Sequence, residues 1–251
     1  MKTVTPLRFY IGLHMPAHAW RFDLVCMSVN VLRGRRKHCM IGFGDGRMML
    51  DSGAFTEISK YGEYRHSPAV YAKEVNALSK ITNMEVCVAQ DYMCEPFILN
   101  KTGMFIVEHQ RLTVRRYDDL LDAGVDVPVM PVIQGYEPDD YVRHIEDYGP
   151  RLTEGMWVGV GSVCKRNGKP EAIRAVLDAI HSTRPDLRIH GFGLKKTSIF
   201  DPAVRRRLYS ADSMAWSFAA RYEGRNQHSP AEAQRYKTQI DNVTGGALWP
   251  A

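Results

Sequence analysis

The 251-residue sequence lacks the features that would place it in a membrane or outside the cell. It contains no run of about 18 or more apolar residues, so we expect no membrane-spanning helix. The N-terminal segment MKTVTPLRFYIGLHMPAHAW has no apolar stretch followed by a small-residue cleavage site, which argues against a secretory signal. The simplest expectation is a cytoplasmic protein.

The sequence also lacks a cysteine framework. No two cysteines form a CxxC pair, and they are odd in number and scattered: Cys26, Cys39, Cys87, Cys94 and Cys164. We therefore expect neither disulfides nor a zinc site. His14 and His18 form an HxxxH pair, but Pro16 lies between them and no acidic residue is adjacent. We interpret them as polar loop residues or as substrate contacts, and we expect no metal and no cofactor.

What the sequence does contain is a regular alternation of short apolar runs and longer amphipathic ones. The apolar runs predict strands at residues 9–13, 24–29, 48–50, 86–89, 127–133, 156–160, 188–192 and 211–216. The amphipathic runs predict helices at residues 67–80, 105–123, 139–148, 171–183, 201–209 and 229–243. Strands that alternate with helices through short connections indicate a parallel sheet.

Eight predicted strands in a chain of 251 residues favour an α/β fold, a single (β/α)₈ TIM-like barrel. No GxGxxG follows the first strand, which argues against an open dinucleotide-binding sheet. No repeat, low-complexity tract or shift in composition marks a second domain, so we expect one domain over residues 1–251. The formal net charge of +5 permits a polyanionic partner without requiring one.

Polar residues follow almost every predicted strand. In a barrel enzyme the chemistry lies at the C-terminal ends of the strands, so these residues are the candidates for a site. The three carboxylates among them, Asp51, Asp91 and Asp212, can divide the roles of nucleophile, general acid/base and ligand recognition. Any one aspartate at a strand end is explained by capping of the next helix. Three of them, together with Gln134, favour a shared site.

These strand ends resemble the motifs of a known family. The segments LDSGAF, QDYMCEP, PVIQGY, VGVGSV, HGFGLKKT and SADSMAWSFAAR are similar, in the same order, to the strand-end motifs of tRNA-guanine transglycosylases. The likeness covers about residues 48–221. The family's CxCxxC…H zinc motif is missing, and the opening RFYIGLHMPAHAW resembles the phage-type branch that acts on DNA, the 7-deazaguanine DNA transglycosylases (DpdA).

The resemblance implies a barrel without a zinc subdomain that exchanges a guanine in DNA for a free 7-deazaguanine base such as preQ0. The exchange would proceed by double displacement through an aspartyl-glycosyl intermediate. The partners would be DNA, with the guanine flipped out or single-stranded, and the free base, with no membrane involved. Oligomeric state stays open. If the chain is encoded by a phage, its location is the host cytoplasm.

The same resemblance implies roles for individual residues. Asp51 would be the general acid/base and Asp212 the nucleophile. An ungapped overlay places the family's nucleophile on Ala215 instead. Asp212 is nevertheless the only acidic residue between Ser210 and Arg221. The expected base-binding residues are Ser52, Gly53, Asp91, Gln134, Gly135, Gly159, Gly161, His190 and Gly193. The expected contacts to the nucleic-acid backbone are Lys195, Lys196, Arg205, Arg206 and Arg207.

Two questions stay open at the level of the sequence. Phe55, Tyr92 and Trp216 neighbour the strand ends and can either sandwich a purine or belong to the core. The missing zinc motif favours DNA over tRNA as the substrate, and the alanine at position 215 leaves a non-catalytic nucleic-acid-binding barrel as a further alternative.

Overall fold

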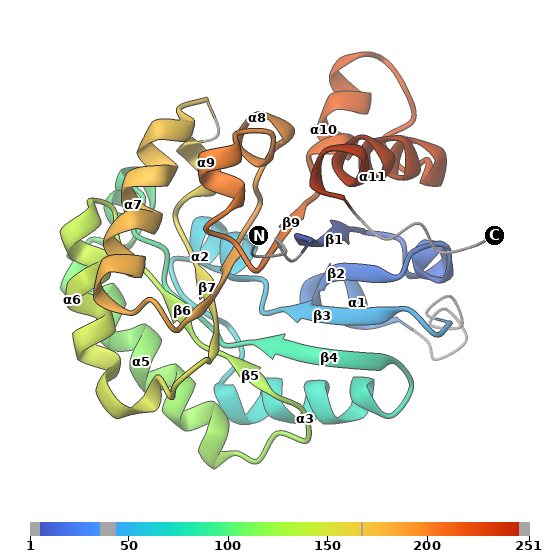
Figure 1. Ribbon diagram of the computed structural model, residues 1–251. Coiled ribbons are helices and arrows are strands. Elements are labelled where there is room, and N and C mark those ends of the chain that lie inside the picture. Colours follow the sequence, from blue (N-terminus) through green and yellow to red (C-terminus); the bar gives the residue numbers. More distant parts are fainter. Residues whose placement is uncertain (1–5, 36–43, 167, 246–251) are drawn as a thin grey trace.

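The computed structural model describes residues 6–35, 44–166 and 168–245, and Cys39 falls outside this set. Its strands form one parallel sheet that curls into a barrel (Figure 1). In chain order the strands are β1 (Arg8–Gly12), β2 (Leu24–Ser28), β3 (Arg47–Asp51), β4 (Asn83–Val88), β5 (Val129–Met130), β6 (Val132–Ile133), β7 (Trp157–Val160), β8 (Arg188–Gly191) and β9 (Ser210–Ser213).

One proline explains why nine strands make an eight-position barrel. The sheet order is β5-β4-β3-β2-β1-β9-β8-β7-β6, so β5 and β6 stand at its two ends. Only Pro131 separates them along the chain, and proline has no N–H to donate to a strand ladder. The N–H of Ala89 donates to the carbonyl of Met130 at 3.0 Å, and the N–H of Gly159 donates to that of Pro131 at 2.9 Å. Residues 129–133 thus join β4 to β7 and close the ring, as expected for a (β/α)₈ barrel.

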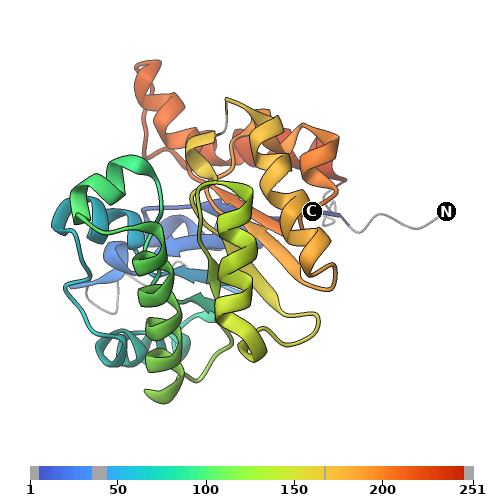
Figure 2. The ribbon, with the colours of Figure 1, turned by 90° about the vertical axis from the view of Figure 1, so that its left-hand side faces the viewer.

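Helices surround the barrel on the outside (Figures 1 and 2). The α-helices are α1 (Val29–Leu32), α2 (Ala54–Tyr61), α3 (Pro68–Ser79), α4 (Pro96–Thr102), α5 (Ile106–Asp122), α6 (Pro138–Tyr148), α7 (Pro170–Thr183), α8 (Lys196–Ile199), α9 (Pro202–Arg205), α10 (Ala215–Tyr222) and α11 (Pro230–Thr244). Short 3₁₀ helices are η1 (Pro16–Arg21), η3 (Gly149–Arg151) and η4 (Cys164–Arg166). Proline, which is preorganised for the first helical position, begins six of the α-helices.

The prediction of a strand at residues 211–216 is wrong in its second half. The strand ends at Ser213, whose hydroxyl accepts a hydrogen bond from the N–H of Ala215 at 3.2 Å and so begins the turn into α10. The indole of Trp216 then donates to the carbonyl of Gly12 at 2.8 Å. The expected helix at residues 201–209 is also shorter, since α9 covers only Pro202–Arg205.

Buried side chains form an inner and an outer layer. Inside the ring lie residues that include Tyr10, Met49, Val88, Met130 and Val132, which fill the barrel as in other folds of this kind. A larger cluster packs between the outer face of the strands and the helices. Because the interior is filled, a ligand can enter only at an end of the barrel. Within the described residues, no helix is both long and apolar enough to cross a membrane.

Replacement of Met49 by alanine tests the packing of the barrel interior. Met49 is fully buried, so we expect the substitution to lower the free energy of unfolding by about 2–5 kcal/mol. Urea denaturation followed by circular dichroism measures the change. Val70→Ala, at a more exposed position on α3, is the control and should change stability by less than about 1 kcal/mol. Equal effects of the two substitutions would contradict a tightly packed interior.

Candidate active site

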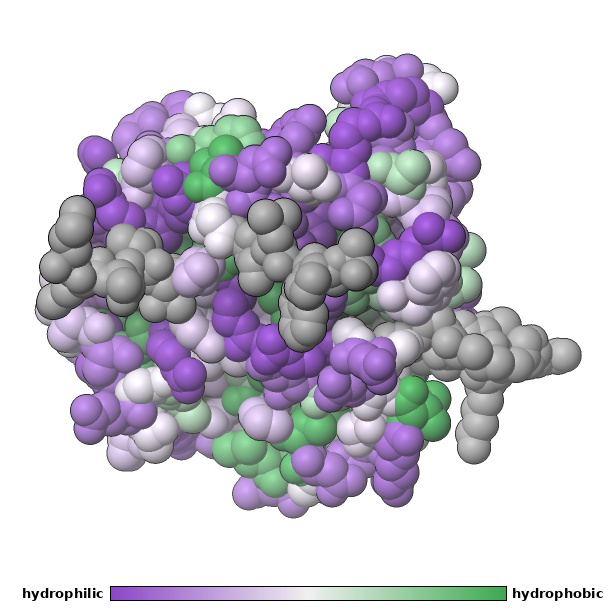
Figure 3. Space-filling model, turned by 45° about the vertical axis from the view of Figure 1, so that its right-hand side comes forward, coloured by the Kyte–Doolittle hydropathy of each residue, from purple (hydrophilic) through white to green (hydrophobic). Residues whose placement is uncertain are grey.

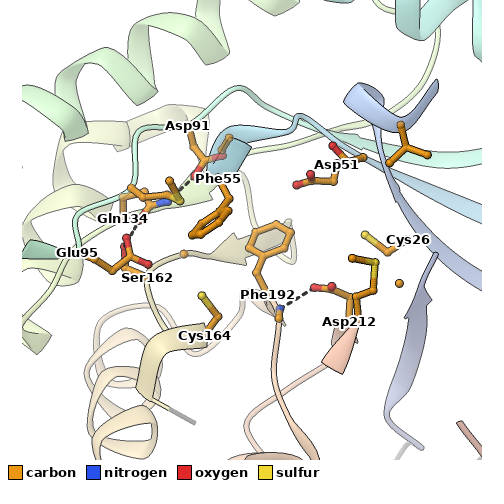
Figure 4. A pocket seen from close by; sticks show the side chains of 18 of the residues that line it. Cys26, Asp51, Phe55, Asp91, Glu95, Gln134, Ser162, Cys164, Phe192 and Asp212 are labelled. Atoms are coloured by element: carbon orange, nitrogen blue, oxygen red, sulfur yellow. Dashed lines mark hydrogen bonds between the residues drawn. The ribbon is translucent and has the colours of Figure 1, made fainter. Parts of the chain in front are cut away.

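A pocket of about 280 Å³ opens at the C-terminal ends of the strands. The side chains of Asp51, Asp91, Gln134 and Asp212 all line it, and each comes from the end of a different strand or from the first three residues after it (Figure 4). These are the residues that strand-end reasoning singled out. Closure of the barrel brings them together, although they are separated by up to 161 positions from Asp51 to Asp212.

Asp212 is held in place by two hydrogen bonds to the same carboxylate oxygen. The N–H of Gly193 donates to Oδ1 at 2.9 Å, and Nε2 of His190 lies 3.3 Å from it. The other ring nitrogen of His190 contacts the hydroxyl of Ser210 at 2.9 Å, which fixes the ring. Because both bonds fall on Oδ1, Oδ2 is the oxygen available to a bound molecule.

Asp51 lies across the pocket from Asp212 (Figure 4). Burial raises the pKa of its carboxyl group to about 6, and the neighbouring charge of Asp212 adds to the increase. The N–H of Gly53 donates to Oδ2 at 3.0 Å and opposes the shift. Gly53 itself has φ +79°, and a Cβ there would lie 2.2 Å from the Asn30 side chain, so this turn requires glycine. The result is a carboxyl group that titrates near neutral pH.

A chain of hydrogen bonds connects the remaining polar groups of the pocket. The amide of Gln134 donates to Oδ2 of Asp91. Its carbonyl oxygen lies 2.9 Å from the hydroxyl of Ser162, and that hydroxyl lies 3.0 Å from Oε2 of Glu95. Burial raises the pKa of Asp91 to about 7, with a further contribution from the charge of Asp51. Gly161 leaves room for this arrangement, because a Cβ there would lie 2.1 Å from Gln134.

Ser162 and Glu95 were missed as functional residues by sequence reasoning. Ser162 adopts φ +56°, a left-handed conformation that is uncommon for a residue with a side chain, and its hydroxyl also accepts a bond from the N–H of Cys94 at 2.9 Å. Burial raises the pKa of Glu95. Its Oε1 has no hydrogen-bond partner within the described part of the chain. The one available signal was position, since both residues follow strands whose ends carry recognised motifs.

Two aromatic rings line the pocket: Phe55, which is one of the three that the sequence suggested, and Phe192, which is not. Phe55 and Phe192 lie between the group formed by Asp91 and Gln134 on one side and the other two aspartates on the opposite side (Figure 4). Tyr92 and Trp216 are buried in the core instead. Phe192 depends on Gly159, where a Cβ would lie 2.3 Å from the ring. Aromatic faces at this position suit a planar heterocycle.

The structure assigns several predicted base-binding residues to supporting positions. Of the nine, Gly161, Gly193, Asp91 and Gln134 line the pocket, whereas Ser52, Gly53, Gly135, Gly159 and His190 are not among its lining residues in the described chain. Ser52 contacts Tyr64 at 3.0 Å, and a Cβ at Gly135 would lie 2.7 Å from Asp140. Ser52 and Gly135 therefore support neighbouring residues and do not face the pocket themselves.

The basic residues chosen for backbone contacts lie at two different ends of the barrel. Lys195 and Lys196 follow β8 and Gly193, on the same side as the pocket, and Lys196 donates to Gln239 at 2.6 Å. Arg205, Arg206 and Arg207 precede β9, so they lie at the opposite end of that strand from the pocket. Arg207 is paired with Asp178, and Arg205 donates to the carbonyl of Ile199 at 3.1 Å.

The described residues contain no group of three or more side chains that is suited to hold a metal ion. His14 forms a short contact of 2.6 Å with His228 rather than with His18. Ala215, the position that matches the family's nucleophile in an ungapped overlay, starts α10 and is not one of the pocket-lining residues described. Asp212 is the carboxylate that β9 presents to the pocket.

A comparison with protein-family models agrees with this geometry. The model of a family described as DpdA, DeoxyPurine in DNA protein A, matches residues 6–234. The chain belongs to the DpdA family. The match covers every strand of the barrel and all the carboxylates of the pocket, and it supports a role as a DNA-modifying guanine transglycosylase. No curated protein sequence matches the chain.

Substitution of Asp91 by asparagine should stabilise the protein at alkaline pH. The pKa of Asp91 is about 7 in the folded state against 3.8 for the free group, so ionisation costs stability as pH rises between these values. Asparagine keeps the bond from Gln134 and removes that cost. We expect a gain of up to about 4 kcal/mol at pH 8, since one pKa unit corresponds to about 1.4 kcal/mol, and little change at pH 4.

Thermal unfolding at pH 4, 6 and 8 measures this effect. Asp122→Asn, at an exposed position on α5, is the control and should show the pH dependence of the unmodified protein. A melting temperature of Asp91→Asn that parallels the unmodified protein at every pH would contradict the assignment of a raised pKa to Asp91.

Proposed function

We propose that the protein exchanges a guanine in DNA for a free 7-deazaguanine base, of which preQ0 is the type, through an aspartyl-glycosyl intermediate. The observation that carries the proposal is the arrangement of three aspartates around one pocket with two aromatic rings between them. This arrangement separates a group that binds a heterocycle, Asp91 with Gln134, from a pair that can act on its sugar, Asp51 with Asp212.

Recognition of the base follows from the hydrogen-bonding groups at the inner side of the pocket. The N1–H and the exocyclic amine of guanine are donors, and an aspartate carboxylate is an acceptor that can face both. A 7-deazaguanine has the same two donors, so Asp91 can hold the leaving and the incoming base alike. The rings of Phe55 and Phe192 provide apolar faces for either heterocycle.

In the first half of the reaction, Oδ2 of Asp212 forms a bond to C1′ of the deoxyribose as the bond from C1′ to N9 of guanine breaks. The electron pair of the broken bond stays on N9, which takes a proton from the carboxylic acid of Asp51. The products are a neutral glycosyl ester on Asp212, an ionised Asp51 and free guanine. A carboxyl group with a pKa of about 6 is suited to this proton transfer.

In the second half, the incoming base loses its N9 proton to Asp51, and N9 forms a bond to C1′ as the ester bond to Asp212 breaks. The electrostatics of the pair favour this order of events. The charge of Asp212 contributes to the raised pKa of Asp51, and that charge is absent while the sugar is attached. Formation of the ester therefore favours the ionised Asp51 that the second half requires.

DNA is the proposed substrate because the chain belongs to the DpdA family. A base in a duplex cannot reach a pocket at the end of a barrel, so the guanine must be flipped out or single-stranded. Free guanine and the free 7-deazaguanine then enter and leave through the same opening. The reaction needs no cofactor, since every proton and electron pair is carried by the two aspartates and the two bases.

Asp212→Asn should abolish exchange, because an amide does not form the glycosyl ester. We expect the incorporation of radiolabelled preQ0 into guanine-containing DNA to fall by at least about 1,000-fold. Asp122→Asn, on the outer helix α5, serves as the control and should retain full incorporation. A covalent protein–DNA adduct trapped in the unmodified protein and absent in Asp212→Asn would exclude a non-catalytic barrel. Incorporation that survives the substitution refutes Asp212 as the nucleophile. Incorporation by the unmodified protein into tRNA but not into DNA refutes DNA as the substrate.

The pH dependence of guanine release tests Asp51. The first half of the reaction uses the protonated acid, so the single-turnover rate of guanine release should fall as pH rises above about 6. Asp51→Asn should release guanine slowly and without this dependence between pH 5 and 8. A rate that falls with pH in the same way in Asp51→Asn would assign the proton transfer to another group.

A further inference from the structure

A second hollow, of about 260 Å³, lies beside the pocket at the same end of the barrel. Met214 lines both, and it follows β9 directly, while His14 follows the neighbouring strand β1 closely. The other lining residues come from α10 and from the segment that joins α10 to α11: Ser217, Phe218, Arg221, Gln227 and His228. The proposed reaction uses none of these side chains.

Contacts between histidines fix the segment after α10 against the end of β1. Nε2 of His14 lies 2.6 Å from Nδ1 of His228, and the ring of His14 stacks on Trp216 with centroids 5.6 Å apart. Burial lowers the pKa of His14, and nearby His228 contributes to the decrease. The lowered pKa favours the neutral form of the His14 ring. This pair makes one wall of the hollow a preformed surface.

Arg221 contributes a positive charge that no ion pair in the described chain compensates. The next two acidic residues after it in the sequence, Glu223 and Glu232, both pair with Arg225 instead. The Arg221 guanidinium lies over the ring of Phe218 at 5.3 Å and near that of Tyr222 at 5.7 Å from the centroids. A cation held by aromatic faces remains available to a phosphate on its open side.

The outward side of α10 carries two large aromatic side chains in solvent. Phe218 is 54% exposed and Tyr222 is 82% exposed, while Trp216 and Ala220 on the inner side of the same helix are buried. α10 and α11 lie side by side on the outside of the barrel, with α11 packed against β1 (Figure 1), and their outer surface is largely hydrophilic (Figure 3). Aromatic rings separated by a cation on a hydrophilic surface are typical of sites where unpaired bases stack.

We propose that this surface, defined by Phe218, Arg221 and Tyr222 with the His14–His228 pair and called here the α10 surface, binds the single-stranded DNA next to the nucleotide that enters the pocket. Unpaired bases stack on Phe218 and Tyr222, and Arg221 contacts a phosphate between them. The inference rests on the proposed function, which supplies DNA as the occupant. The choice of this location rests on Met214, which lines both hollows and so places the α10 surface next to a strand whose guanine occupies the pocket.

Fluorescence anisotropy of a labelled single-stranded oligonucleotide that contains guanine tests the α10 surface. We expect Phe218→Ala and Tyr222→Ala each to weaken binding by about tenfold, as loss of a stacking partner does. Arg221→Gln should weaken binding and reduce the slope of log affinity against log salt concentration by about one. Melting temperatures near that of the unmodified protein would show that these surface substitutions leave the fold intact.

Trp20→Ala is a matched control. Trp20 is 58% exposed and has the guanidinium of Arg21 over its ring at 4.5 Å, so it has the same chemistry as Phe218 with Arg221. It precedes β2 and lies beside Gly44, which precedes β3, so it is at the opposite end of the barrel from the pocket. We expect Trp20→Ala to bind the oligonucleotide as the unmodified protein does.

The outcomes separate this inference from the proposed function. Weaker binding in the α10 variants with unchanged binding in Trp20→Ala supports the α10 surface, whether or not labelled base is incorporated. Equal affinity in the α10 variants and the unmodified protein overturns the inference, even if exchange occurs. Equal weakening in Trp20→Ala also overturns it, because binding would then depend on exposed aromatic residues in general. Binding without any exchange refutes the proposed function alone.

Discussion

Closure of the sheet at Pro131 is the constraint on which the site depends. The segment 129–133 pairs with β4 through its first half and with β7 through its second. It thereby joins Asp91, which follows β4, to Ser162, which follows β7, through Gln134 at its own end. An open sheet would place β5 and β6 at distant edges. In the closed ring, the same strand that completes the barrel supplies the amide that links the two sides of the pocket.

The pocket contains buried carboxyl groups, and their ionisation lowers the free energy of unfolding. Burial raises the pKa values of Asp51 and Asp91 to about 6 and about 7, so ionisation of either group near neutral pH opposes folding. The same property gives the proposed reaction a carboxyl group that both donates and accepts a proton in that pH range. Stability and chemistry thus make opposite demands on the same residues, as is common where pKa values are strongly shifted.

The position of α10 beside the pocket also follows from the architecture of the barrel. After β9 the chain turns at Ser213 into α10, and Trp216 anchors that helix to the end of β1. The anchor places the outward side of α10 beside the pocket. The proposed nucleophile Asp212 and the α10 side chains proposed to hold the flanking strand therefore lie within ten positions of each other, from Asp212 to Tyr222. A rigid element next to the reacting nucleotide suits a substrate that must be held out of its stack.

The sequence by itself determined the alternation of strands and helices, because buried parallel strands and amphipathic helices impose different periods on apolar residues. It also identified Asp51, Asp91, Gln134 and Asp212, since strand ends are local features and converge at one end of a parallel barrel. The sequence could not predict roles that depend on contacts between residues far apart in the chain. Glu95 lines the pocket, but its contact with Ser162, which is remote in the chain, could not be inferred from the sequence.

Only the tertiary structure decided which of the predicted residues face the pocket. Gly159 is required by the ring of Phe192, and His190 orients Asp212 rather than lining the pocket itself. Arg205–Arg207 read as a basic cluster in the sequence, yet they precede β9 and so lie at the opposite end of the barrel from the pocket. The physical reason is that a linear pattern fixes where a residue stands along its own strand or helix. Which groups share one space depends on how the strands are paired and how the ring is closed.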